Sequence, residues 1–140
     1  MREIYCSLLF VGILAAADVS PESEKSIARV SLVGLIASPG AYDEKKVSVI
    51  GYISTGYEDE ILYIHREDYE NSIPSNGVRL VIPEQMRGQL KSGRYVEVHG
   101  VFRMYTAGDT SNGMAGRITS ITKIEPWFLA AQEHQGRGCW

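Results

Sequence analysis

The chain has 140 residues, of which 44% are hydrophobic and 22% charged, with 14 Lys and Arg against 17 Asp and Glu. This length provides for one domain. The balance of apolar and charged residues excludes a disordered chain, a fibrous rod and a protein with several membrane spans. The formal net charge of −3 disfavours a uniformly basic nucleic-acid-binding protein.

The N-terminal residues have the pattern of a secretory signal peptide. A short charged start (residues 1–3) precedes an apolar run over residues 4–14, and three alanines follow at residues 15–17. The apolar run is shorter than the roughly 20 residues that a membrane span needs, and the small residues fit cleavage before Asp18. We therefore predict a periplasmic or secreted protein with a signal peptide over residues 1–17. A buried N-terminal helix and an uncleaved anchor are the alternatives.

The predicted mature chain keeps one cysteine. Cys6 lies within the apolar run, and Cys139 lies in a glycine-rich tail. Because one thiol cannot form an internal disulfide, packing alone must stabilise an exported form. We expect a polar linker over residues 18–27, a folded domain over residues 28–127 and a flexible tail over residues 128–140.

The folded domain is predicted to begin with a short helix. Ser31 is placed to cap it, and Pro39-Gly40 would end it. Its apolar residues are Leu32, Val33, Leu35 and Ile36. Val30, Leu32 and Gly34 also alternate with their neighbours as in a strand, so a strand over residues 30–37 is the competing prediction.

Five strands are predicted after this helix. In the first, Val47, Val49 and Ile53 alternate with Ser48, Ile50 and Tyr52, and Gly51 indicates a bend or bulge. An acidic turn at residues 58–60 leads into the second strand, and a polar stretch over residues 66–76 follows it. The remaining elements are a strand over residues 78–82, a helix over residues 84–90, and strands over residues 95–105 and 115–124.

The order of these elements predicts a small barrel. Short antiparallel strands within about 80 residues close most easily in this way. The segments Lys46-Val47-Ser48-Val49-Ile50-Gly51-Tyr52 and Tyr95-Val96-Glu97-Val98-His99-Gly100-Val101-Phe102 are alternating strands, each broken by a glycine. They resemble the first and fourth strands of an OB-fold, and residues 45–126 are similar to small exported bacterial OB-fold-like proteins. The resemblance implies a mainly β, five-stranded OB-like Greek-key barrel with a short helix between strands 3 and 4. An SH3-like small barrel is the alternative.

The resemblance also implies a ligand face. OB-folds bind across the outer face of their first three strands, and aromatic rings beside a cation suit base or sugar stacking. The alternative is that the tyrosines of this face only pack at the barrel edge. The candidate ligand-binding residues are Tyr52, Tyr63, His65, Arg66 and Arg79.

The run over residues 65–70 is the densest polar segment. Arg66 is spaced to pair with Glu70 across one helical turn, and Asp68 is placed to cap or turn the loop. A structural role is the alternative to a functional one for this segment.

Patterns for catalysis and metal binding are missing from the sequence. It has no Gly-x-Ser-x-Gly elbow, and the glycines at 108 and 113 lack the Lys-Ser/Thr of a phosphate-binding loop. The histidines lack i, i+4 spacing, no Cys-x-x-Cys occurs, and the acids of residues 58–70 do not match an EF-hand. We therefore predict no catalytic residues, no metal site and no cofactor, and keep a small metal-dependent protein or enzyme as the third candidate.

Charge is unevenly placed along the chain. Residues 57–70 carry six acids and one base, whereas residues 79–123 carry seven bases and three acids. The basic segment could attract a phosphate backbone or an anionic envelope polymer, or it could form a salt-bridged surface.

These observations favour an exported, non-enzymatic binding module. Its OB-like barrel face would contact a protein, a peptide or an anionic envelope component, with an open barrel edge available for strand addition. We expect no stable membrane span after signal cleavage. The second candidate is an oligonucleotide-binding OB domain that uses Tyr52, Tyr63, Arg79 and the loop over residues 106–113.

Overall fold

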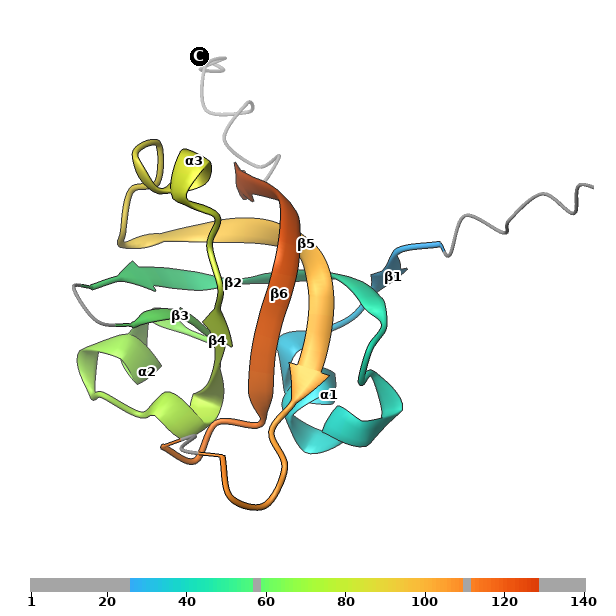
Figure 1. Ribbon diagram of the computed structural model, residues 1–140. Helices are drawn as coiled ribbons and strands as arrows, with labels where there is room; N and C mark the ends of the chain where they lie inside the picture. Colours follow the sequence, from blue (N-terminus) through green and yellow to red (C-terminus); the bar gives the residue numbers. More distant parts are fainter. Residues whose placement is uncertain (1–25, 57–58, 110–111, 129–140) are drawn as a thin grey trace, which may run out of the picture.

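The computed structural model describes residues 26–56, 59–109 and 112–128. Figure 1 shows strongly curved strands, with α1 and α2 on opposite sides of the molecule. In chain order the elements are β1 (Ala28–Arg29), α1 (Leu32–Ala37), η1 (Pro39–Ala41), β2 (Lys46–Thr55), β3 (Glu60–Tyr63), α2 (Arg66–Glu70), η2 (Pro74–Asn76), β4 (Gly77–Leu80), α3 (Glu84–Arg87), β5 (Arg94–Met104) and β6 (Gly116–Pro126).

The strands close into a barrel. The sheet has the order β1-β2-β3-β4-β6-β5, and a further pairing joins β2 to β5. Among strands β2 to β6, neighbouring strands are antiparallel, with the exception of β4 and β6, which are parallel. The result is a closed five-stranded mixed barrel, and it confirms the predicted mainly β, OB-like barrel with a short helix between its third and fourth strands. The two-residue β1, which pairs with the start of β2, is too short to show alternation in the sequence.

The inner face of the barrel holds the hydrophobic core. Val47, Val49 and Ile53 are fully buried on β2, as their alternation predicts. Phe102 on β5 is the largest fully buried side chain. The other barrel-strand residues of this core are Leu62, Val78, Leu80, Val96, Val98, Ile118 and Ile121.

The two glycine-broken strands behave differently. At Gly100 the β5–β6 register shifts between His99 and Val101, as expected for a strand that bends around a barrel corner. At Gly51 the register between β2 and β5 is continuous, so of the predicted bend or bulge this pairing excludes the bulge. Gly51 is instead required by close packing, because a β carbon at this position would lie 2.7 Å from Leu62 Cγ.

The helices are short. Ser31 Oγ accepts a hydrogen bond from Gly34 N at 3.0 Å, which confirms the capped helix over the competing strand. Helix α3 ends at Arg87 rather than Leu90. Helix α2 lies in the polar stretch over residues 66–76, where the sequence predicted one helical turn at most. Its five residues are too few to show a helical period.

Several sequence predictions fall outside the described residues. These are the signal peptide over residues 1–17, most of the linker, Cys139 and the tail beyond Phe128. Within the described ranges, every helix is too short or too polar to cross a membrane.

Candidate functional site

Four tyrosines gather on the outer face of the barrel, and we call them the tyrosine cluster. Tyr52 on β2 is paired in register with Tyr63 on β3 and with Tyr95 on β5. The ring centroid of Tyr69, from α2, lies 5.8 Å from that of Tyr52 and 6.0 Å from that of Tyr63. The Tyr95 ring meets Tyr52 edge-on at 5.4 Å. These distances are typical of favourable aromatic contacts.

The cluster has a buried floor and an exposed rim. Tyr52 and Tyr63 are only 8% and 6% exposed, whereas Tyr69 and Tyr95 are 42% and 39% exposed. Met114, from the loop before β6, belongs to the same buried cluster as Tyr52, Tyr63 and Ile61. Burial raises the pKa of the Tyr63 phenol, and its acidic neighbours raise it further. Two of the predicted ligand residues therefore lie on the predicted face but beneath other side chains.

Asp68 holds α2, and with it Tyr69, over the floor of the cluster. Its Oδ2 accepts a hydrogen bond from His65 N at 3.0 Å, and its Oδ1 accepts one from Asn76 Nδ2 at 2.8 Å. The carboxylate thus caps the helix and ties it to the segment before β4, which confirms the predicted capping role. Arg66 pairs with Glu70 at 2.7 Å, as its spacing predicts.

We expect Asp68→Ala to lower the free energy of unfolding by about 1–3 kcal/mol, because two donors lose their acceptor in a buried site. The measurement is urea denaturation. Glu67→Ala is the matched control, since Glu67 is an exposed carboxylate of the same helical turn. Equal losses in the two variants would contradict the capping role.

Two of the other predicted ligand residues, His65 and Arg79, are not paired with the floor tyrosines, whereas Arg66 lies beside the cluster. His65, together with Ile50 and Arg29, lines a hollow of about 410 Å³ beside α1. Arg79 faces Ile61 rather than Tyr63.

The oppositely charged segments meet in the fold. Arg79 pairs with Asp59 at 2.8 Å, and Arg87 pairs with Glu60 at 3.3 Å. Because acidic and basic residues distant in sequence neutralise each other, the charge separation along the sequence is reduced in space.

A polar group on β1, β2 and β5 was not predicted. Glu97 Oε1 accepts hydrogen bonds from Ser48 Oγ at 2.6 Å and Arg29 Nη2 at 3.2 Å, and His99 Nε2 also lies 3.2 Å away. The carboxylate occupies the centre, and the hydroxyl bonds to it directly. In a serine hydrolase the hydroxyl is hydrogen-bonded to the imidazole. Here the hydroxyl, the imidazole and Arg29 of β1 all contact the carboxylate, so the group ties β1 to the barrel.

The Glu97 carboxylate is expected to make stability depend on pH. Hydrogen bonds from Ser48, then His99 and Arg29, lower its pKa from 4.5 to about 2. Because the folded pKa is depressed, this contribution to the free energy of unfolding is full above about pH 4.5 and is lost as pH falls towards about 2. We expect the difference in stability between the wild-type chain and Glu97→Gln to shrink over that interval. Denaturant titrations from about pH 6 to about pH 2 measure it, and a constant difference would contradict the assignment.

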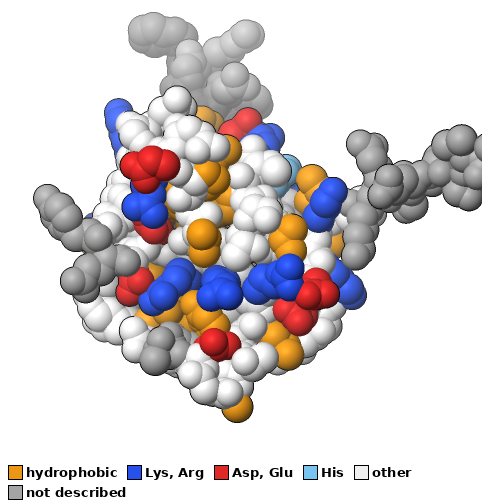
Figure 2. All heavy atoms as spheres, viewed as in Figure 1, with side chains coloured by type: hydrophobic (Ala, Val, Ile, Leu, Met, Phe, Trp, Pro, Cys, Tyr) orange, Lys and Arg blue, Asp and Glu red, His pale blue; other side chains and the backbone are white. Residues whose placement is uncertain are grey.

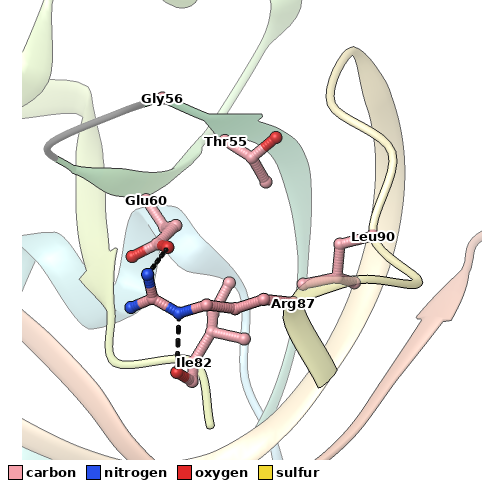
Figure 3. Close-up of a pocket in the computed structure, with 6 residues that line it drawn as sticks. All are labelled: Thr55, Gly56, Glu60, Ile82, Arg87 and Leu90. Atoms are coloured by element: carbon pink, nitrogen blue, oxygen red, sulfur yellow. Dashed lines mark hydrogen bonds and ion pairs between the residues drawn. The ribbon is translucent and has the colours of Figure 1, made fainter. Parts of the chain in front are cut away.

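A second hollow, of about 310 Å³, lies at one end of the barrel between the β2–β3 hairpin and α3. Figure 3 shows the Arg87 side chain extended towards Glu60. Its Nε also donates to the Ile82 carbonyl oxygen at 3.4 Å. Arg87 binds Glu60 and the Ile82 carbonyl across this hollow, so it braces α3 against the barrel.

Within the described residues, no three His, Cys, Asp or Glu side chains are placed to hold one metal ion. No protein-family model matches the chain. No curated protein matches it either. Among solved structures, the chain is similar to "Crystal structure of a putative aspartyl-tRNA synthetase from Leishmania major Friedlin", with 15% sequence identity and a TM-score of 0.45. That match covers 77% of this chain and 22% of the other.

Proposed function

We propose that the chain is a non-enzymatic binding module that contacts a protein or peptide segment through the rim of the tyrosine cluster. One observation carries the proposal. Tyr69 and Tyr95 are exposed on a support of buried tyrosines, so both rings stand at the surface in fixed positions. Rigid tyrosines offer a large contact area at low entropic cost, and they are enriched at the centres of protein interfaces.

The burial of the floor favours a protein partner over an oligonucleotide at this face. Base stacking needs a free ring face, and Tyr52 and Tyr63 are only 8% and 6% exposed. Arg66, the cation beside the cluster, is paired with Glu70. We therefore expect a contact dominated by aromatic packing, which salt weakens little.

The test is recovery of a partner from a cell-envelope extract on the immobilised full chain, with washes at increasing salt. We expect a single partner that persists at high salt on the wild-type chain, and at least tenfold less of it on the Tyr69→Ala/Tyr95→Ala double variant. Val33→Ala is the control, because Val33 is an exposed apolar residue on α1, outside the cluster. Equal recovery by the double variant would overturn the proposal.

We further propose that the module is exported and related to the small exported OB-fold-like proteins. The apolar run over residues 4–14 and the alanines at residues 15–17 support export. We expect intact-mass spectrometry of the exported form to find a chain that begins at Asp18. Recovery of the uncleaved chain from the cytoplasm would contradict export.

A further inference from the structure

Three arginines form a row across the outer face of β4, β6 and β5. In register, Arg79 lies opposite Arg117, and Arg117 lies opposite Arg103. Because neighbouring strands are about 4.8 Å apart, the three side chains leave the sheet along a line of about 10 Å. Figure 2 shows this arginine row as blue side chains over these strands, with a red side chain at each end.

The arginine row needs opposite charge. Like charges on directly opposed residues destabilise a sheet. Asp59 pairs with Arg79 at 2.8 Å, and Glu44 pairs with Arg103. The side chains of these pairs are 31–67% exposed, and ion pairs that water reaches contribute little to stability, so another anion can replace either carboxylate. Among the residues that the structure describes, no carboxylate lies within 4.0 Å of the central Arg117. The nearby Asp109 carboxyl is bound by Thr106, and these hydrogen bonds, together with the charge of Arg117, lower its pKa.

The centre of the row is organised for an acceptor. The Arg117 guanidinium carbon lies 5.8 Å from the centre of the Tyr105 ring, a cation–π contact that orients the guanidinium. The Tyr105 hydroxyl and Arg79 Nε are buried without hydrogen-bond partners in the described structure. Neither atom is open to a surface ligand, so an acceptor would bind the exposed parts of the guanidinium groups, whose side chains are 31% exposed at Arg79 and 48% exposed at Arg103.

We propose that the arginine row binds a chain of phosphate groups. The planar guanidinium donates paired hydrogen bonds that match phosphate oxygens. A single phosphate would engage one arginine, whereas a linear chain presents repeated charges along the whole row. Inorganic polyphosphate and the backbone of a single-stranded oligonucleotide share this chemistry. Because recognition uses phosphate oxygens, binding is independent of the bases.

The test titrates the full chain with three probes: inorganic polyphosphate, single-stranded homopolymer oligonucleotides of different bases, and inorganic orthophosphate. We expect both polymers to bind, with affinity that falls steeply between about 50 mM and 200 mM salt. Orthophosphate should bind at least tenfold more weakly. Polyphosphate binding without oligonucleotide binding would identify the phosphoanhydride chain as the source and still support the proposal.

The central variant is Arg117→Gln. We expect it to weaken polymer binding about tenfold and to reduce the salt slope by about one. Lys91→Gln removes the same charge near the opposite end of β6, and it should bind as the wild-type chain does. Because Arg117 faces two other arginines, Arg117→Gln is expected to melt at or above the wild-type temperature. If it unfolds, Arg117→Lys keeps the charge and removes the planar donor, and it should bind more weakly than the wild-type chain.

Four results would overturn the proposal. These are no polymer binding at the lower salt, wild-type affinity in both Arg117 variants, orthophosphate affinity equal to that of the polymers, and base-dependent oligonucleotide binding without any polyphosphate binding.

Discussion

Gly116→Ala is expected to lower the free energy of unfolding by about 3 kcal/mol or more, because it overpacks the place where β6 meets β5. A β carbon at this position would lie 2.6 Å from Phe102 Cζ and would also press on the Arg103 carbonyl oxygen. Phe102 is fully buried and the carbonyl belongs to the paired strand, so neither can move freely. Urea denaturation measures the loss.

Gly88→Ala is the matched control for this prediction. A β carbon at Gly88 meets no atom within 4 Å, and its φ of −65° suits any residue. We therefore expect Gly88→Ala to leave stability unchanged or to raise it by about 0.4–1 kcal/mol. A loss at Gly116 no larger than the change at Gly88 would contradict the close approach of β5 and β6.

Tyr52→Ala is expected to cost about 3–5 kcal/mol of stability, the usual range for removing a buried aromatic side chain. Tyr52 is the central ring of the cluster, in contact with Tyr69 on one side and Tyr95 on the other. Its removal leaves a cavity and frees both rim rings. Tyr69→Ala is expected to cost about 1 kcal/mol or less, because that residue is 42% exposed and leaves a smaller cavity.

Thermal and urea denaturation of both variants measure the loss of stability at the floor of the cluster and at its rim. Tyr52→Phe keeps the ring and is expected to retain most of the wild-type stability. Equal costs for Tyr52→Ala and Tyr69→Ala would contradict the distinction between a buried floor and an exposed rim.

The barrel could be predicted because its long strands carry their own pattern. The alternation of Val47, Val49 and Ile53 places one face of β2 in the core whatever its partners are. The two-residue β1 and the five-residue α2 carry no such period. Their positions depend on contacts with distant strands, which a single sequence does not show.

The outer face could be predicted, but its covering could not. Alternation placed Tyr52 and Tyr63 on one face, which is correct. Whether that face is open depends on Tyr69 and Met114, which reach it through a helix and a loop of irregular structure.

The polar contacts between strands can be predicted only when the register of the paired strands is known. Ser48 and His99 are directly opposed only in the β2–β5 pairing, and the arginine row exists only where β4, β6 and β5 pair. A shift of one residue would turn these side chains to the other face. The local contact between Arg66 and Glu70 needed only helical spacing, and it was predicted correctly.

Site-specific photocrosslinking in cells that express the full chain tests the binding role of the cluster rim most directly. A photoreactive amino acid would replace Tyr69 or Tyr95 and, as the control, the exposed Val33. We predict the same discrete crosslinked partner from positions 69 and 95, and none from position 33. Absence of a crosslink at both rim positions, or the same product from all three, would contradict a binding surface built on the tyrosine cluster.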